Sequence, residues 1–394
     1  MEDQSEISIK KPAQILYWVL FVVFILAPVV VFILVYDEVD TQNYEERTLA
    51  AFPYSEESYE DGVATTYDTF ASEFESWFDD HLPFRNQLLS MYGQFEYCVL
   101  KSSTSDSVIV GKEGWLFYKG EQVNDEDPIG DYRGTDLLTE EELEIIASNL
   151  THMRDELEKE DCKFYVYIAP NKERVYSEYM PDMYGEPTEY GTIHQLTEYL
   201  KENTDLQVVC GLDDIMTFKE ENPDIQLYYK YDTHWNGIGA YVGAEELMQT
   251  MDYTYDEFEE LTISTQEYAN YDLARLLHLQ NVLTDDTYYL LSDYTPHDMS
   301  LSMEDDGLVI RYHTSDGSAP GEKLVMIGDS FATMLMPYVA CHFINSYMTY
   351  YYHYSYEDLM EEEPSEVVFE VVERYIGNLV DFTLEDGYQG DVIE

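Results

Sequence analysis

The sequence predicts an α/β domain with a mostly parallel sheet, because short apolar strands alternate with helices along much of the chain. Thr139 is expected to cap a helix that begins with three glutamates and runs to about Lys159. Phe164 to Ala169 follows as a strand of β-branched and aromatic residues, which Pro170 and Asn171 end.

The same alternation continues toward the end of the chain. We expect helices near 191–202, near 236–251 and from Ser330, and strands at Leu206–Cys210, Lys323–Ile327 and Val367–Val372. The stretch 252–320 is rich in tyrosine and aspartate and breaks this rhythm, so it is expected to be an excursion from the sheet.

Upstream of these units the pattern is different. Apolar residues recur at helical spacing on either side of Pro83, which predicts two amphipathic helices between about 63 and 100. Val108 to Tyr118 then predicts a short strand with a glycine turn.

The charge balance excludes a nucleic-acid-binding protein. The 394 residues include 81 acidic and 20 basic side chains, giving a formal net charge of −61, and such a surface repels phosphate backbones. With 45% hydrophobic and 15% aromatic residues, the chain can bury a core, which disordered chains cannot do.

An apolar segment near the start predicts a membrane anchor. No charged residue occurs from Ala13 to Tyr36, which is long enough to cross a bilayer. Lys10 and Lys11 precede this segment and acidic residues follow it, so the positive-inside rule places the start of the chain in the cytoplasm and the remainder outside. A cleaved signal peptide is the alternative, but its apolar core would be shorter. We therefore expect a single-pass protein of the cell membrane with an extracytoplasmic domain.

These observations divide the chain into five parts. They are a cytoplasmic tail (1–12), a transmembrane anchor (13–36), an acidic linker (37–62), a helical extension (63–107) and the α/β domain (108–394). The cysteines Cys98, Cys162, Cys210 and Cys341 lack CxxC or metal-finger spacing, and either up to two disulfides or free buried thiols fit them.

Gly328-Asp329-Ser330 is the sharpest local signal of chemistry, because it follows a buried strand and opens a helix. Ligands of parallel α/β sheets bind beyond the carboxyl ends of strands. A serine at that position can attack a carbonyl and help to hold the resulting oxyanion at the helix N-terminus. The alternative is that Ser330 only caps the helix.

Asp232 and His234 supply the partners that a serine nucleophile needs. They lie two residues apart, just before a predicted helix. The carboxylate can therefore hold the imidazole while the other ring nitrogen faces the serine. Asp-x-His is also a metal-binding spacing, but no third His or Cys ligand occurs at motif spacing, so no metal is expected.

Five blocks together resemble the DHHW family, the SGNH-hydrolase-like proteins of the alginate O-acetyltransferase type. In chain order they are Asp80-His81, Gly111-Lys112-Glu113-Gly114-Trp115-Leu116-Phe117, Ala169-Pro170-Asn171-Lys172-Glu173, Asp232-Thr233-His234-Trp235 and Gly328-Asp329-Ser330. Asp232 and His234 precede Ser330, which is the permuted order of the acetyltransferase-like branch.

This resemblance implies an SGNH-like α/β/α sandwich in which Ser330 is the nucleophile, His234 the general base and then acid, and Asp232 the orienting carboxylate. It also implies an extracytoplasmic O-acetyltransferase that acts through an acyl-serine on a cell-surface or secreted polysaccharide. A membrane-bound O-acyltransferase would be the acetyl donor, and no soluble cofactor is required. A carbohydrate acetylesterase and a non-catalytic glycan-binding scaffold are the alternatives.

Some positions depart from the family pattern. Tyr271 stands where a GDLA-like segment has glycine, and no Gly-x-Asn-Asp block supplies a second oxyanion donor. We expect Asn171 as its substitute, with Asp329 and Trp235 as further candidates for contact with the oxyanion or substrate.

The Asp80-His81 block lies in the predicted helical extension, close to Arg85. These three residues either reach the site or form a salt-bridged structural corner.

Overall fold

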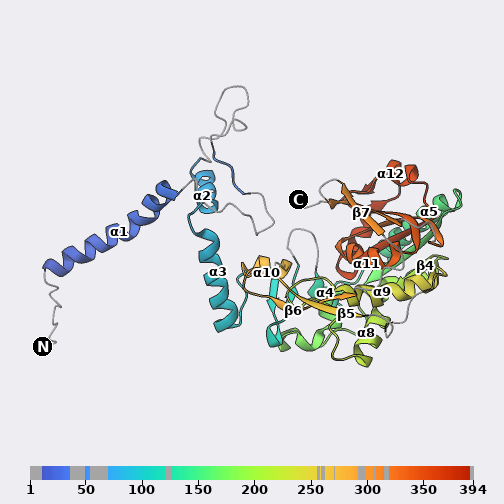
Figure 1. Ribbon diagram of the computed structural model, residues 1–394, viewed down its shortest axis with the longest axis horizontal. Coiled ribbons are helices and arrows are strands. Elements are labelled where there is room, and N and C mark those ends of the chain that lie inside the picture. Colours follow the sequence, from blue (N-terminus) through green and yellow to red (C-terminus); the bar gives the residue numbers. More distant parts are fainter. Residues whose placement is uncertain are drawn as a thin grey trace, which may run out of the picture. The chain divides into compact units, whose positions relative to one another are not determined.

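A computed structural model of the chain contains two compact units, residues 1–95 and 96–394 (Figure 1). The structure describes residues 11–35, 49–53, 70–120, 127–254, 258, 262–269, 271–291, 299–304, 307–314 and 319–390. Nearly all of the predicted cytoplasmic tail and acidic linker lies outside the described residues.

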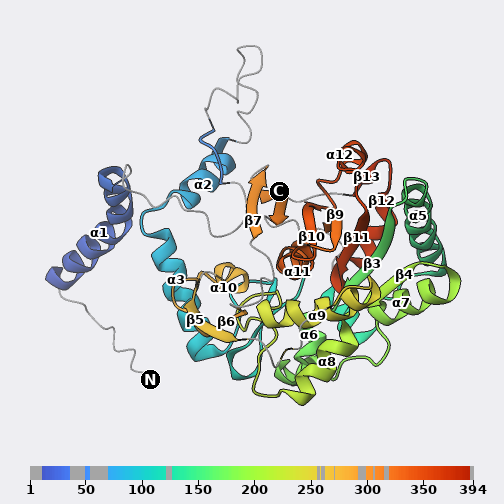
Figure 2. The ribbon, with the colours of Figure 1, turned by 45° about the vertical axis from the view of Figure 1, so that its right-hand side comes forward.

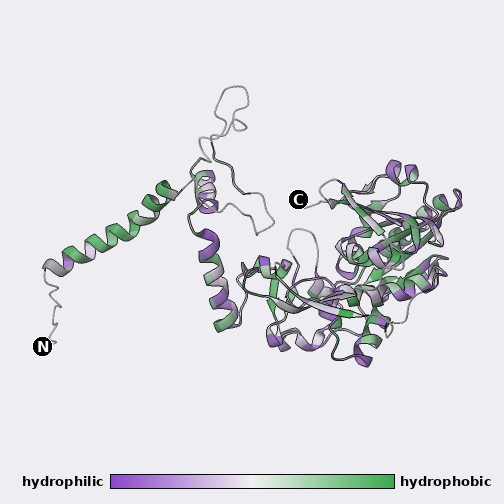
Figure 3. Ribbon diagram, viewed as in Figure 1, coloured by the Kyte–Doolittle hydropathy of each residue, from purple (hydrophilic) through white to green (hydrophobic). Residues whose placement is uncertain are grey.

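The first helix, α1 (Lys11–Val35), contains most of the segment predicted to span a membrane. It is hydrophobic along most of its length (Figure 3). Even so, no helix within the described ranges is both long enough and apolar enough for a membrane crossing. The predicted transmembrane helix is therefore not supported.

The two amphipathic helices predicted around Pro83 are confirmed as α2 (Phe70–Asp80) and α3 (Arg85–Phe95). Asp80 is buried, accepts a hydrogen bond from the backbone N–H of Ala50 at 2.8 Å, and lies 4.0 Å from the guanidinium of Arg85. Nδ1 of His81 is 2.8 Å from the backbone oxygen of Trp77. The Asp80-His81 block thus forms the salt-bridged corner.

The second unit begins with a short π-helix (Glu96–Leu100) and a hairpin. Strands β1 (Val108–Val110) and β2 (Leu116–Tyr118) pair antiparallel across a 3₁₀ turn (Lys112–Gly114), as the glycine turn predicts. Helix α4 (Pro128–Arg133) follows.

A seven-stranded sheet forms the centre of this unit, in the order β4-β3-β11-β9-β10-β8-β7. Its five parallel strands are β3 (Lys163–Ala169), β4 (Gln207–Cys210), β9 (Gly321–Gly328), β10 (Phe343–Tyr350) and β11 (Glu366–Val372). The predicted strands are confirmed to within two residues at each end, and β10 was not predicted.

The expectation that 252–320 leaves the sheet is wrong in part. Strands β5 (Ile263–Tyr268) and β6 (Asp285–Leu291) do form a separate two-stranded sheet. However, β7 (Met299–Glu304) and β8 (Val309–Thr314) extend the main sheet, each pairing antiparallel. Antiparallel edge strands need no crossover helix, so the strand–helix rhythm gives no sign of them.

Helices cover both faces of the sheet, which makes the α/β fold a sandwich with a mixed sheet. Helices α5 (Glu140–Glu158) and α7 (Thr192–Asn203) pack on one side, and α9 (Gly237–Thr250) and α11 (Ser330–Ala340) pack together on the other (Figure 2). Thr139 caps α5 in a capping box with Glu142, as expected. Helix α8 (Leu212–Glu221) was not predicted.

The remaining short elements are α6 (Lys172–Val175), the 3₁₀ turns η5 (Ser177–Tyr179) and η6 (Asp182–Tyr184), α10 (Asp272–Leu276), α12 (Tyr356–Glu361), the 3₁₀ segment η9 (Glu373–Asp381) and the strand pair β12 (Phe382–Thr383) and β13 (Gly387–Tyr388). All four cysteines are free thiols, of which Cys162 and Cys341 are buried. The thiols are thus free, but not all are buried as the reduced alternative expected, because Cys98 is exposed and Cys210 is half-buried.

Candidate active site

The sheet brings two loops together where β9 and β11 end, because neighbouring parallel strands finish at the same edge. Asp329 follows β9 and caps α11: one carboxylate oxygen accepts the N–H of Phe331 at 2.8 Å, and the other accepts the N–H of Val372 at 2.7 Å. Asp329 is only 2% exposed. It therefore joins α11 to β11, which leaves its carboxylate engaged with backbone rather than with an oxyanion or substrate.

Because Asp329 is the cap, Ser330 is the first residue of α11 and does not serve as the N-cap. Its Oγ lies 2.7 Å from Nε2 of His234, although the two residues are 96 positions apart. Nδ1 of the same ring lies 2.6 Å from Oδ1 of Asp232. Asp232 as a carboxylate only accepts, so Nδ1 donates and Nε2 is left to accept the hydroxyl of Ser330.

The charges of this chain of groups support one another. Burial acts to raise the pKa of Asp232, but the hydrogen bond and charge of His234 outweigh it and hold that pKa well below its usual range. Burial acts to lower the pKa of His234, and Asp232, helped by Asp272, outweighs it and raises that pKa. The imidazole is thus a strengthened base that faces the serine hydroxyl.

The glycine before Asp329 is required by close packing. A Cβ on Gly328 would lie 2.6 Å from the Cβ of Ala332 and 2.7 Å from Oε2 of Glu370. Glu370 is fully buried on β11, and burial followed by the charge of Asp329 raises its pKa well above the usual value. The same carboxyl accepts the N–H of Asp329 at 3.0 Å.

Of two further candidates, only Trp235 is shown to be placed otherwise than expected. Asn171 follows β3, and β11 lies between that strand and β9, so its contact with the oxyanion stays a prediction. Its side chain is 1% exposed, and neither amide atom has a hydrogen-bond partner among the described residues. Trp235 is fully buried and donates from Nε1 to the backbone oxygen of Phe331 at 3.2 Å. It is a core residue beneath the site, because its ring has no face open to a substrate.

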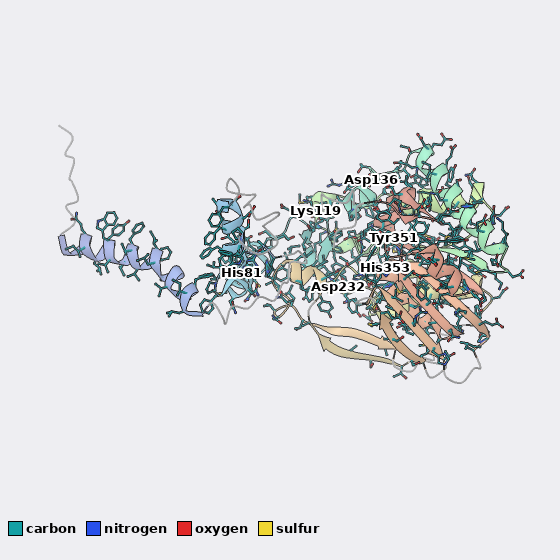
Figure 4. The ribbon with its side chains drawn as sticks, turned by 90° about the horizontal axis from the view of Figure 1, so that it is seen from above. His81, Lys119, Asp136, Asp232, Tyr351 and His353 are labelled. Atoms are coloured by element: carbon teal, nitrogen blue, oxygen red, sulfur yellow. The ribbon has the colours of Figure 1, made fainter. Side chains whose placement is uncertain are left out.

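Sequence alone placed Lys172 in the block at 169–173 and gave it no role. Its contacts explain why that block occurs together with the blocks at 111–117 and 232–235. Its buried ammonium donates to the backbone oxygens of Leu116, Lys230 and Asp232, at 2.6, 3.1 and 2.7 Å. The neighbouring Glu173 accepts the N–H of Tyr118 at 2.8 Å. These contacts join the hairpin to the loop of Asp232, the residue that Figure 4 labels, and so fix its position.

Asp272 and Arg374 were missed as parts of the site. Oδ2 of Asp272 lies 3.6 Å from Nδ1 of His234, and the GDLA-like segment was the signal that contained it. Arg374 directly follows Glu373 after β11, and its guanidinium lies 5.1 Å from the ring centroid of Phe331. The substitution at Tyr271 does no harm, because its φ of −65° needs no glycine.

Asp232, His234 and Asp272 are also the one set of residues in the described part of the chain whose donor atoms are close enough to hold a metal ion. The three atoms lie within 4.8 Å of one another. A metal there would replace the short contact between His234 and Asp232, so metal binding and the serine arrangement exclude each other.

A sheet with parallel central strands that carries Ser, His and Asp side chains in one hydrogen-bonded chain is an arrangement of hydrolase-like α/β proteins, among them the SGNH-hydrolase-like class. Within that class, the chain belongs to the family described as "SGNH hydrolase-like domain, acetyltransferase AlgX", whose model matches residues 108–333, more than half of the chain. The predicted family resemblance is confirmed.

Known proteins extend this result. The chain is 22% identical over 184 residues to a probable alginate O-acetylase AlgJ of Pseudomonas syringae pv. tomato, and 23% identical over 181 residues to that of Pseudomonas putida. The matches cover 44% and 46% of this chain but only 40% and 43% of the relatives. The chain thus spans less than half of these curated relatives.

Among solved structures, Bacillus cereus PatB1 with a sulfonyl adduct has a TM-score of 0.50 and 14% identity. The match covers 70% of this chain and 99% of that one. At this identity the likeness shows the shared fold.

Proposed function

We propose that this protein is an O-acetyltransferase that moves acetyl groups onto hydroxyls of a polysaccharide through an acyl-serine at Ser330. The observation that carries the proposal is the unbroken contact from Ser330 through His234 to Asp232, at 2.7 and 2.6 Å. Family membership supports acetyl transfer, and the curated relatives named alginate O-acetylases support a polysaccharide acceptor.

The proposed reaction has two halves. In the first, Nε2 of His234 takes the proton of Ser330 as Oγ attacks the acetyl carbonyl, and the protonated ring then gives that proton to the leaving group. In the second, Nε2 takes the proton of an acceptor hydroxyl, which attacks the acetyl-serine, and the proton returns to Oγ. The N-terminus of α11 stabilises the negative oxygen in both halves.

A cavity of about 460 Å³ is lined by neither Ser330 nor His234, so we propose it only as a site for a part of the acceptor away from the reacting hydroxyl. Arg374 lines it and also lies over the ring of Phe331, the residue after Ser330. The acidic residues of its lining are Asp131, Asp136, Glu142, Glu373 and Asp381 (Figure 4 labels Asp136). The net charge of −61 favours a neutral or cationic glycan over a polyuronate unless divalent cations screen both surfaces.

An extracytoplasmic location and a membrane-bound O-acyltransferase as acetyl donor are further parts of the proposal. They rest on the family resemblance.

Intact mass measurement with peptide mapping tests the proposal. The purified full-length chain is incubated with p-nitrophenyl acetate, beside Ser330→Ala as the matched control. We expect an acetyl adduct on Ser330 that is absent from the variant, and that neutral oligosaccharides discharge faster than water does.

The other outcomes contradict the proposal in different ways. An adduct that water discharges as fast as any oligosaccharide would identify an acetylesterase. Absence of an adduct from the wild-type chain would leave the glycan-binding scaffold as the better account.

A further inference from the structure

Asp272 holds the Asp232–His234 segment through a reciprocal pair of hydrogen bonds. Its backbone N–H donates to Oδ2 of Asp232 at 2.9 Å, and its Oδ1 accepts the backbone N–H of Thr233 at 2.9 Å. Its Oδ2 accepts the hydroxyl of Thr233 at 2.5 Å. The first turn of α10 is also tied to this loop by the N–H of Ala274, which donates to the backbone oxygen of Tyr231 at 3.2 Å.

The same carboxylate faces the imidazole. Nδ1 of His234 has Oδ1 of Asp232 at 2.6 Å and Oδ2 of Asp272 at 3.6 Å. A Ser-His-Asp arrangement needs only one carboxylate to orient the ring and stabilise the imidazolium. Here a second one lies beside the same ring nitrogen, on an element about forty positions further along the chain.

We propose that Asp272 is a positioning residue of the acyl-transfer machinery, which clamps the Asp232–His234 segment and gives the imidazolium a second carboxylate partner. This inference rests on the proposed function for its effect on rate, but not for its effect on the imidazole itself. Asp272 takes no part in the proton transfer: Nε2 carries the proton until the leaving group takes it, and meanwhile the positive charge of the ring is shared between two carboxylates at Nδ1.

The groups that act on this cluster come from three elements. Asp232 and His234 belong to the loop before α9, and Arg374 follows β11 and opposes protonation of the ring. Strand β2 packs on α10 and carries one titratable side chain, the phenol of Tyr118. Burial first, and then the charge of Asp232, raises the pKa of Asp272 to about 6. Above that pH its charge adds to that of Asp232.

Asp272→Asn keeps the size of the side chain and removes its charge. We expect the pKa of His234, followed by NMR of its ring protons, to fall, because one of two stabilising negative charges is lost. The acidic limb of the pH–rate profile should move to lower pH with it. The plateau rate of acetyl transfer should drop about tenfold to a hundredfold, as for a catalytic base that is less well held.

Two variants make the experiment decisive. Asp272→Glu retains the charge, so it should restore most of the pKa of His234 even if the rate stays low. Asp213→Asn removes an exposed carboxylate from the first turn of α8 and should change neither readout.

An unchanged pKa of His234 in Asp272→Asn would overturn the inference, whether or not the chain transfers acetyl groups. Conversely, loss of activity in Ser330→Ala together with normal kinetics in Asp272→Asn would keep the proposed function and remove Asp272 from it. Because the NMR titration needs no turnover, failure of the acetyltransferase proposal would still leave the carboxylate pair testable.

Discussion

Lys172 is a buried cation that stabilises the site by donating hydrogen bonds to three backbone oxygens at once. It is 1% exposed, and its ammonium also lies 5.2 Å from the ring centroids of both Trp115 and Phe117. A charge taken out of water is tolerated only where hydrogen bonds replace its hydration. The residue therefore fixes the hairpin and the Asp232 loop in one arrangement, and the site depends on a side chain that touches no substrate.

Lys172→Met should destabilise the fold and reduce acyl transfer together. Methionine is of similar length but donates nothing, so three buried carbonyl groups would lose their charged donor. We expect the free energy of unfolding to fall by about 3–5 kcal/mol, measured by urea denaturation. Lys112→Met, at a half-exposed surface ion pair with Asp182, should cost less than about 1 kcal/mol. Equal losses in the two variants would contradict this account.

At the scale of elements, α11, β9 and β11 meet at Gly328 with no room for one more carbon atom. Gly328→Ala should lower the free energy of unfolding by about 1–3 kcal/mol, because the new Cβ would meet Ala332 and the buried Glu370. The backbone at residue 328 must move to make room for the new Cβ, and α11 begins two residues later. This displacement should lengthen the contact between Ser330 and His234 and slow acetylation.

Gly377→Ala is the matched control, because nothing lies within 4 Å of the position of its Cβ. Thermal unfolding of both variants checks the prediction. If Gly328→Ala melted at the wild-type temperature, the packing argument for the Gly-Asp-Ser turn would be wrong.

The elements that sequence predicts well are those with a local signature. The strand at 164–169 and the capped helix after Thr139 depend on local composition and capping chemistry, and both are present. Strands β7, β8 and β10 were missed because they depend on pairing with other strands: β10 pairs with β9, β8 with β10, and β7 with β8. Such pairing is a tertiary contact, which local composition does not show.

The residues of the candidate site also differ in whether local sequence could identify them. Ser330, His234 and Asp232 could be named because each stands in a motif whose chemistry is specific. Trp235 was placed wrongly because its burial depends on packing partners that are distant in the sequence. Asp272 required the tertiary contact between α10 and the Asp232 loop before its carboxylate could be connected with the site.

For the whole molecule, acid should stabilise the fold across the neutral range. Burial raises the pKa of Asp131 to about 8 and that of Asp272 to about 6, and their usual value is 3.8. A carboxyl whose pKa is higher in the folded state binds its proton more tightly there. Its contribution is complete below about pH 4 and is lost as the pH rises through the folded value.

We therefore expect the melting temperature to fall by roughly 2–5 °C between pH 5 and pH 8 at low ionic strength. Salt should raise it most at pH 8, because the net charge of −61 repels itself and salt screens that repulsion. Differential scanning calorimetry at several salt concentrations measures both effects. Asp131→Asn should flatten the pH dependence, and a melting temperature that rises with pH would contradict the prediction.

The order of strands in the sheet also governs when the protein can fold. Strand β3 is made early, yet its neighbour β11 is among the last segments of the chain: Asn171 and Glu373, bonded across the two, are 202 positions apart. Contacts so distant in sequence are entropically costly to close and slow to form. During synthesis, Asp232 and His234 are made well before β9 and β11, the strands whose ends carry the rest of the site. Ser330 is therefore the last of the three side chains to be made, and β11, whose Val372 holds Asp329, follows it, so a chain that ends before Val372 lacks the contact that fixes the nucleophile turn.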